Sequence, residues 1–148
     1  MSSKLVVYLD VDGTILYEPR DGTEREDLDF QLVCDGLEEL LDFVLAHCKP
    51  YWLTNRARLG RTTALAERLF PHLPACARRI PPTYWDNFKY EGLDLGQHFV
   101  WFDDDPEDED IDWLEGRNRI DSFVRMNPGH RQNPRRILAE IKARMEQL

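Results

Sequence analysis

The sequence predicts an α/β fold, a three-layer α/β/α sandwich built on a mainly parallel, Rossmann-like sheet. Short apolar runs rich in β-branched and aromatic residues alternate along the chain with segments of helical periodicity. Such alternation favours parallel strands joined by helices that cover both faces of one sheet. The chain has 148 residues, of which 42% are hydrophobic, so it can form a single domain over residues 1–148 with a substantial core.

The first part of the chain predicts a strand, a surface excursion and a helix. Residues 4–9 form a continuous apolar run, which is typical of a strand buried on both faces. Residues 17–31 are polar and rich in turn formers, so we expect them to cross the surface. A helix is expected to begin at Asp35 as its N-cap and to end near residues 47–49, before Pro50. Its apolar residues recur at helical spacing: Leu37, Leu40, Leu41, Val44 and Leu45.

The middle of the chain predicts a short strand followed by an irregular connection. The strand should cover residues 51–54, and a helix should follow over residues 60–70 with these side chains facing inward: Leu65, Ala66 and Leu69. Residues 71–84 contain four prolines, so this part should be irregular apart from a short strand at 77–80. A further short helix is expected within residues 85–95.

The last third of the chain predicts two more strands and a terminal helix. Residues 98–102 are apolar and aromatic, as in a buried strand, and another strand is expected near residues 119–125. The terminal helix should run over residues 134–146. The acidic run at residues 107–112 indicates a solvated loop or the start of a helix.

Composition excludes several classes of protein. The formal net charge of −9 argues against broad electrostatic attachment to nucleic acid or to an anionic membrane, although four arginines form a local basic run: Arg56, Arg58, Arg61 and Arg68. Three cysteines without short paired spacing predict free thiols rather than a disulfide framework or a zinc site. There is no apolar stretch of membrane-spanning length and no signal-peptide pattern, so we expect a cytoplasmic protein without a membrane partner.

Polar side chains end three of the predicted strands. Asp10 and Asp12 directly follow the first strand, and Gly13 lets the chain turn away. Thr54 closes the second strand, and Asp103 follows a later one. Because ligands of parallel sheets lie beyond the carboxyl ends of the strands, we expect these side chains to converge. Adjacent carboxylates repel each other, whereas a divalent cation would offset that repulsion and leave an oxygen free to attack an electrophile.

Taken in chain order, four motifs resemble those of the phosphatase branch of the haloacid dehalogenase superfamily: Asp10-Val11-Asp12-Gly13-Thr14, Thr54, Lys89 and Asp103-Asp104. The resemblance covers residues 5–105, and its first motif is the most specific. It implies the same α/β fold that the alternating pattern predicts. The short form of the chain is also similar to domains of this superfamily found beside RNA-repair enzymes, a narrower and less specific match.

The resemblance implies a separate role for each catalytic side chain. Asp10 would attack phosphorus to form an aspartyl-phosphate, and Asp12 would protonate the leaving oxygen and then activate water. An acid at the position of Asp12 favours phosphoryl transfer over carbon–halogen cleavage, because dehalogenases of the superfamily usually lack it. Thr54 would bind the phosphoryl oxygens and Lys89 would offset negative charge. Arg78, Arg79 or another base could serve in place of the lysine: this alternative stays open.

The resemblance also implies a Mg²⁺ site. Asp103 and Asp104 would hold the ion together with the carboxylate of Asp10 and the backbone carbonyl of Asp12. Which of Asp103, Asp104 and Asp105 contacts the ion directly is left open by the sequence, because successive residues at a strand end point in different directions. Without the ion, the clustered carboxylates would repel a phosphate dianion, so we expect the activity to depend on metal.

No large cap domain is expected over this site. The 39 residues from 15 to 53 and the 34 residues from 55 to 88 are mostly needed for core elements. In this superfamily an open site usually goes with macromolecular substrates or with closure by a partner subunit. The expected substrate contacts are Gly13, Thr14, Asn55 and Arg56, and the arginine could reach a second phosphate. Trp85 is the tryptophan most suited to touch a substrate.

The expected function is therefore Mg²⁺-dependent hydrolysis of a phosphomonoester. The phosphate could belong to a nucleic-acid end, a nucleotide or a phosphoprotein, and the sequence does not rank these firmly. Two alternatives share the same residues: a noncatalytic module that binds phosphate or metal, and a phosphotransferase that uses an acceptor other than water. The oligomeric state does not follow from the sequence.

Overall fold

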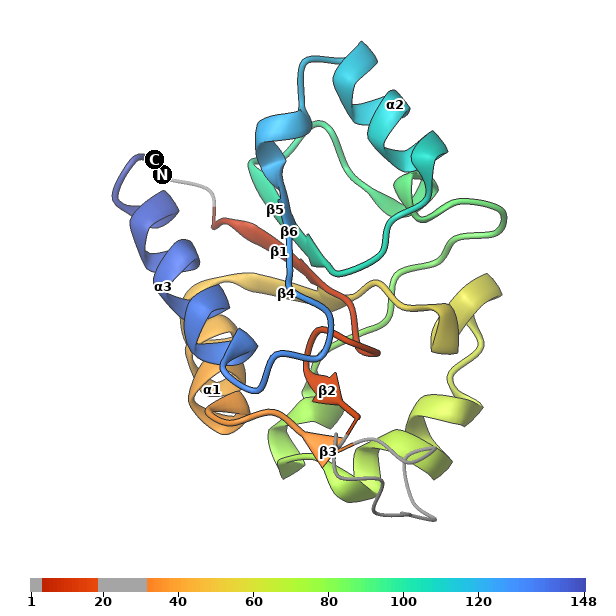
Figure 1. Ribbon diagram of the computed structural model, residues 1–148, viewed down its shortest axis with the longest axis vertical. Helices are drawn as coiled ribbons and strands as arrows, with labels where there is room; N and C mark the ends of the chain where they lie inside the picture. The colour runs from red at the N-terminus through yellow and green to blue at the C-terminus, as the bar shows by residue number, and fades with distance from the viewer. Residues whose placement is uncertain (1–3, 19–31) are drawn as a thin grey trace.

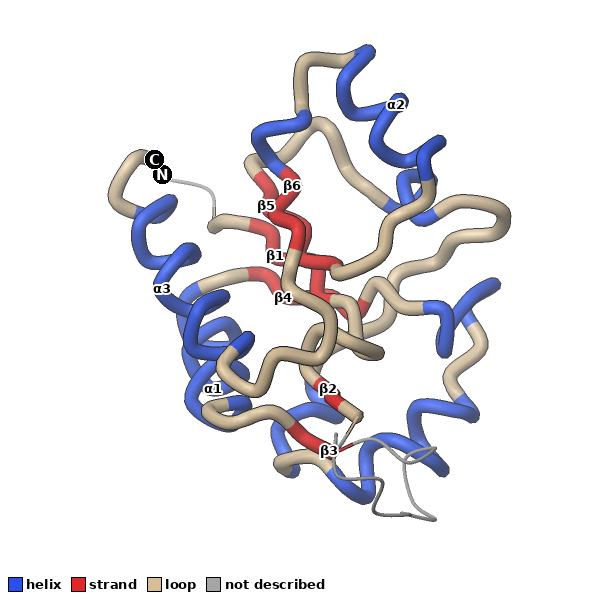
Figure 2. Tube along the Cα trace, viewed as in Figure 1, coloured by secondary structure: helices blue, strands red, loops and turns tan. Residues whose placement is uncertain are grey.

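The computed structural model describes residues 4–18 and 32–148 and has an α/β fold with a four-stranded parallel sheet between helices (Figures 1 and 2). The strands lie in the order β4-β1-β5-β6. Their bounds are Val6–Leu9 (β1), Lys49–Trp52 (β4), Phe99–Asp103 (β5) and Phe123–Arg125 (β6). A second, antiparallel pair consists of β2 (Leu16–Tyr17) and β3 (Leu32–Val33). Except for residues 17 and 18, the predicted surface excursion lies outside the described residues.

The inner strand β1 is buried along its whole length, as its continuous apolar run predicts. It pairs in parallel with β4 on one side and with β5 on the other. Successive side chains point to opposite faces of the sheet. Val7 and Leu9 therefore belong to one apolar cluster, and Val6 and Tyr8 belong to a second. The sheet thus has a core on each face, as a three-layer arrangement requires.

Helices α1 (Leu37–His47) and α3 (Asn133–Met145) pack together on one face of the sheet (Figure 1). The prediction that Asp35 caps α1 is wrong, because the N-cap is Gly36 and no side chain caps the helix. The Asp35 carboxylate instead accepts a hydrogen bond from Nε2 of Gln132 at 3.1 Å. It also pairs with Arg131 at 3.6 Å. This side chain therefore joins the start of α1 to the loop that precedes α3.

The other face carries α2 (Asp108–Gly116) and a cluster rich in aromatic side chains (Figure 1). The acidic run predicted as a solvated loop or a helix start is the start of this helix. Its buried Leu114 packs with residues of β1 and β5, including Trp101. The predicted last strand is shorter than expected, because Ile120–Ser122 form a 3₁₀ turn before β6 begins.

The chain between β4 and β5 folds mainly as short helical turns: Asn55–Gly60, Leu65–Leu69, Phe70–His72, Ala75–Arg79 and Lys89–Gly92. The predicted strand at 77–80 is wrong, because a 3₁₀ helix covers most of it and Pro82 makes the bridge to Trp52 of β4. The predicted helix 60–70 forms only in part: residues 63–64 are α-helical and Leu65–Leu69 form a π-helical turn. Leu65 and Leu69 are buried as predicted, whereas Ala66 is exposed.

Strand β4 begins two residues earlier than predicted and includes Pro50. A proline is tolerated there because β4 lies at the edge of the four-stranded sheet.

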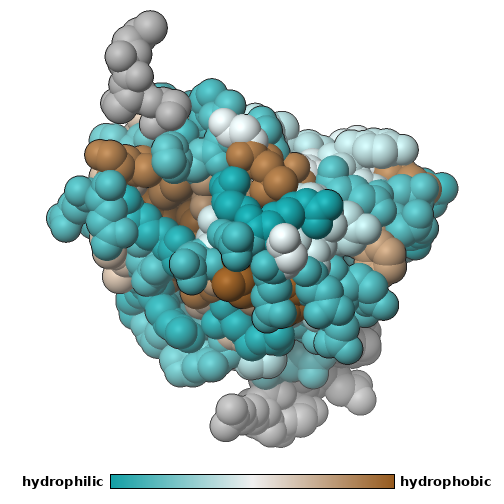
Figure 3. Space-filling view, turned by 90° about the horizontal axis from the view of Figure 1, so that it is seen from above, coloured by the Kyte–Doolittle hydropathy of each residue, from teal (hydrophilic) through white to brown (hydrophobic). Residues whose placement is uncertain are grey.

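The face of the molecule shown in Figure 3 is mostly hydrophilic, with smaller apolar areas between the polar side chains. Among the described residues, no helix combines the length and the apolar character needed to cross a membrane.

Candidate active site

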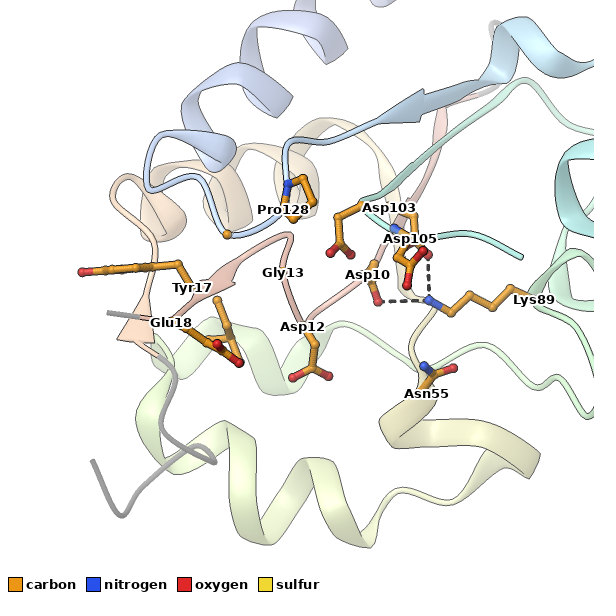
Figure 4. A pocket seen from close by; sticks show the side chains of 13 residues that line it. Asp10, Asp12, Gly13, Tyr17, Glu18, Asn55, Lys89, Asp103, Asp105 and Pro128 are labelled. Atoms are coloured by element: carbon orange, nitrogen blue, oxygen red, sulfur yellow. Dashed lines mark hydrogen bonds and ion pairs between the residues drawn. The ribbon is translucent and has the colours of Figure 1, made fainter. Parts of the chain in front are cut away.

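The carboxyl ends of three strands meet beside a pocket of about 460 Å³ (Figure 4). Asp10 directly follows β1, Asn55 lies three residues beyond β4, and Asp103 is the last residue of β5. The pocket is lined by most of the residues that the sequence singled out: Asp10, Asp12, Gly13, Asn55, Lys89, Asp103 and Asp104. Parallel pairing of β1 with β4 and β5 is what brings together side chains that are far apart in the sequence.

Asp10 is buried, with 4% of its surface exposed, and both of its carboxylate oxygens are engaged. Oδ1 pairs with Nζ of Lys89 at 3.1 Å, and Oδ2 accepts a hydrogen bond from Oγ1 of Thr14 at 3.1 Å. Burial and the neighbouring Asp103 raise the pKa of Asp10 well above its ordinary value, although Lys89 opposes this shift. Thr14, a predicted substrate contact, is fully buried and does not line the pocket. Its hydroxyl is bonded to Asp10 instead.

Lys89 places its ammonium group between two carboxylates (Figure 4). Its Nζ lies 2.6 Å from Oδ2 of Asp103, in addition to its bond with Asp10. Burial by itself would lower the pKa of Lys89, but Asp10 and Asp103 raise it above its usual value, so the side chain stays charged. Neighbouring contacts hold the turn: Glu91 accepts from the backbone N–H of Phe88, and Asp110 accepts from that of Tyr90.

Asp10, Asp103 and Asp104 form the acidic group of this pocket. Each offers an oxygen, and these oxygens lie within 4.8 Å of one another. Burial raises the pKa of Asp104, as it does that of Asp10. Within the described chain, the carboxylate of Asp12 is not part of this group, and Asp105 contributes its backbone N–H to Oδ1 of Asp103 at 3.0 Å. An all-oxygen donor set of this kind suits a hard divalent cation.

Gly13 allows the acidic group to approach the loop after β1. Its φ of +77° is in the left-handed region, which favours glycine. A Cβ atom at this position would lie 2.1 Å from Oδ2 of Asp104, far closer than atoms can approach. The Gly13 carbonyl accepts a hydrogen bond from the backbone N–H of Gly129 at 2.8 Å. The backbone conformation at this position therefore favours glycine, and the Asp104 carboxylate occupies the space that a Cβ atom would need.

Asp12 and Arg56 form a bidentate ion pair at the edge of the pocket. Nη2 of Arg56 lies 2.7 Å from Oδ1 of Asp12, and Nε donates to Oδ2 at 3.0 Å. The arginine side chain is 11% exposed and the aspartate side chain is 41% exposed. The sequence predicted that Arg56 contacts the substrate, but Arg56 does not line the pocket, and its guanidinium group is bonded to Asp12.

Thr54, which was predicted to bind the phosphoryl oxygens, is almost fully buried just beyond the end of β4 and does not line the pocket. Its Oγ1 accepts a hydrogen bond from the backbone N–H of Arg56 at 3.2 Å, and its carbonyl accepts from Nε1 of Trp85 at 3.1 Å. Trp85, the tryptophan predicted to touch the substrate, is 5% exposed and packs in the apolar cluster on the α2 face. It also lines an adjoining pocket together with Asn55 and Lys89, so its contact with a substrate stays a prediction.

Five lining residues were not singled out by the sequence: Leu16, Tyr17, Glu18, Pro128 and Gly129. Asp105, which the sequence left open as a metal contact, also lines the pocket. Tyr17 and Glu18 border the pocket on the side away from Lys89 (Figure 4). The sequence placed them in a surface excursion, so it gave no reason to bring them to the site. The Asn-Pro-Gly turn at 127–129 was a detectable signal, because it lies between the last strand and the terminal helix.

No protein-family model matches the chain, and no curated protein matches it either. The similarity to the haloacid dehalogenase superfamily therefore stays a prediction from the motifs. The arrangement combines the buried carboxylate of Asp10, the ammonium group of Lys89 and the more exposed carboxylate of Asp12. Asp103 and Asp104 add their carboxylate oxygens to that of Asp10. This combination can support nucleophilic attack by one carboxylate and proton transfer by the other.

Proposed function

We propose that this chain is a Mg²⁺-dependent phosphatase of the haloacid dehalogenase type, which hydrolyses phosphomonoesters through an aspartyl-phosphate on Asp10. One observation carries the proposal. Lys89 bridges Asp10 and Asp103 inside a pocket at the carboxyl edge of a parallel sheet, and Asp104 completes a group of three close carboxylates. A structural ion pair would need only one acid beside the lysine, whereas phosphoryl transfer uses all of these groups.

The acidic group fits a magnesium ion by its chemistry. Mg²⁺ prefers oxygen ligands, and the three carboxylates of Asp10, Asp103 and Asp104 supply them. Their negative charge exceeds the single positive charge of Lys89, and burial already opposes ionisation of Asp10 and Asp104. When bound, the ion would neutralise this excess and the charge of the incoming phosphoryl group.

In the first step, a carboxylate oxygen of Asp10 attacks phosphorus and the bond from phosphorus to the leaving oxygen breaks. Asp12 gives its proton to that leaving oxygen, and its partial exposure lets it reach a group that enters from solvent. Lys89 offsets the negative charges of the attacking Asp10 carboxylate and of the phosphoryl oxygens, which reduces the repulsion between them. The hydroxyl of Thr54 does not line the pocket; it accepts a hydrogen bond from the backbone N–H of Arg56 and so holds the turn beyond β4.

In the second step, Asp12 acts as the base. Its carboxylate takes a proton from water while the water oxygen attacks phosphorus. The bond between phosphorus and the Asp10 oxygen breaks, which releases inorganic phosphate and restores the Asp10 carboxylate. Thr14 remains bonded to Oδ2 of Asp10 and keeps the nucleophile in one orientation during both steps.

Hydrolysis of an aryl phosphate, with and without Mg²⁺, tests the proposal. The wild-type protein should release phosphate only with the ion, and Asp10→Asn should lower turnover by at least about a thousandfold. Acid quenching during turnover of a ³²P-labelled ester should leave label on the wild-type protein and not on the variant. Undiminished turnover by Asp10→Asn would show that Asp10 is not the nucleophile.

Substrate preference is the second part of the test. Among the described residues, the elements between β1 and β4 are the β2–β3 pair and α1, and those between β4 and β5 are short helical turns. A site without a large cap in the described part of the chain supports a phosphate carried by a macromolecule or a nucleotide. Phosphorylated oligonucleotides, mononucleotides and phosphopeptides should be compared at equal concentration. Higher activity on small metabolites than on any of these would contradict the macromolecular assignment.

A further inference from the structure

We infer that Arg56 is a positioning residue, which orients the Asp12 carboxylate for both of its proton transfers and does not act by binding the substrate phosphate. This inference rests on the proposed function, in which Asp12 is the acid and then the base. The evidence is the two-bond contact between the guanidinium group and Asp12, with distances of 2.7 and 3.0 Å. A fork of two parallel bonds fixes both the position and the plane of a carboxylate.

The arginine is held more firmly than its partner. Its backbone N–H is bonded to Oγ1 of Thr54, and its residue lies in the 3₁₀ turn that follows β4. The Arg56 side chain is 11% exposed, whereas that of Asp12 is 41% exposed. The two-bond contact restricts the side-chain rotamers that the partly exposed Asp12 can adopt. The pair therefore transfers the rigidity of the β4 end to the acid that follows β1.

The contact is compatible with both protonation states that the reaction needs. When Asp12 is a carboxylate, both of its oxygens accept from Arg56, as observed. When one oxygen carries the proton for the leaving group, the other oxygen still accepts from the guanidinium group. The side chain keeps its direction in either case. Arg56 can therefore act through Asp12, although the sequence suggested a direct contact with phosphate.

The test compares two esters that differ in their need for a general acid. A nitrophenolate leaves without protonation, whereas an alkoxide does not. Arg56→Ala should lower kcat/KM for an alkyl phosphate by about a hundredfold, a typical contribution of general acid catalysis, and should lower that for nitrophenyl phosphate by less than about tenfold. Arg56→Lys keeps the charge but loses the fork, so its loss on the alkyl ester should be intermediate.

Two controls separate this role from a general effect on folding. Arg61→Ala removes an exposed arginine from the end of the same turn and should leave both esters unaffected. In a background of Asp12→Asn, which removes the acid, Arg56→Ala should cause no further loss on the alkyl ester. If Arg56→Ala does not fold, as judged by its thermal melting, Arg56→Lys and the corresponding double variant supply the same comparison.

The outcomes distinguish the inference from the proposed function. Equal losses on both esters would mean that Arg56 contacts the phosphoryl group, and no loss on either would mean that the ion pair is incidental. A further loss in the Asp12→Asn background would also overturn the inference. No hydrolysis of either ester by the wild-type protein would overturn the proposed function, and the inference with it.

Discussion

The two halves of the acidic stretch at residues 103–112 contain the same kind of side chain but lie in different surroundings. Asp103 and Asp104, at the end of β5, meet Asp10 and Lys89 in a pocket. The acids of residues 107–112 instead begin α2, where backbone N–H groups face them. A high density of acidic residues therefore does not by itself form a site. A site forms where carboxylates converge without enough positive charge to balance them.

Asp110 makes the contrast clear because it is as buried as Asp103, with 1% of each residue exposed. Its Oδ1 accepts from the backbone N–H of Tyr90 at 2.9 Å, and its Oδ2 accepts from that of Glu107 at 3.1 Å. Burial raises the pKa of Asp110, and these two donors oppose the shift. Asp110 therefore has a full set of structural partners, whereas the group around Asp103 still lacks positive charge.

Removing one acid from the pocket should have the largest effect. Asp104→Ala leaves two carboxylates for the ion, so we expect Mg²⁺ affinity to fall by at least about tenfold and activity to fall with it. Isothermal titration with Mg²⁺ and a chelator titration of the activity would measure this change. The matched change Asp108→Ala, at an exposed acid of α2, should alter neither. Equal Mg²⁺ affinity in the two variants would contradict the prediction that Asp104 binds the ion and Asp108 does not.

Replacing Lys89, the cationic side chain of the pocket, should have the largest effect on stability. Lys89→Met leaves Asp10 and Asp103 buried without their partner, and breaking a buried pair typically costs about 3 kcal/mol. We expect a lower free energy of unfolding in the absence of metal, with a part of the loss recovered in millimolar Mg²⁺. Urea unfolding with and without the ion would measure both quantities. A variant as stable as the wild type would contradict the excess of negative charge that we infer.

Removing the buried acid of α2 should affect stability and leave the chemistry intact. Asp110→Ala deprives two backbone N–H groups of their acceptor, so we expect a loss of about 1–3 kcal/mol. Mg²⁺ affinity should remain that of the wild type, because this carboxylate is not in the pocket group. Thermal melting and the same titration would test the two statements. A fall in Mg²⁺ affinity as large as that of Asp104→Ala would place Asp110 in the site.

The smallest expected effect concerns pH. The folded state raises the pKa of Asp10 and Asp104, so their contribution to stability is present below the ordinary value of about 3.9 and is lost as pH rises through the raised values. Mg²⁺ competes with protons for the same oxygens. The increase in Tm caused by Mg²⁺ should therefore be larger at pH 8 than at pH 5. An equal increase at both values would indicate that the ion binds elsewhere.

Much of the scaffold could be predicted because its signals are local. Local patterns predicted three elements: β1 from its buried apolar run, α1 from its helical periodicity and β5 from its apolar residues. Strand β1 is followed by an acid and β5 ends at one. The errors occur where competing contacts override local preference. Residues 77–80 form a helical turn and not a strand, and Asp35 bonds to the loop before α3 and does not cap α1.

Asp10 and Asp103 could be placed at the carboxyl ends of strands from the sequence, because an apolar run and the residue that ends it are adjacent in the chain. Which side chains meet depends instead on how the strands and loops pack in three dimensions. Lys89 reaches Asp10 across 79 positions, and Arg56 reaches Asp12 across 44. The order β4-β1-β5 makes both contacts possible. Strand order depends on the packing of the whole chain, and so no local pattern encodes these pairs.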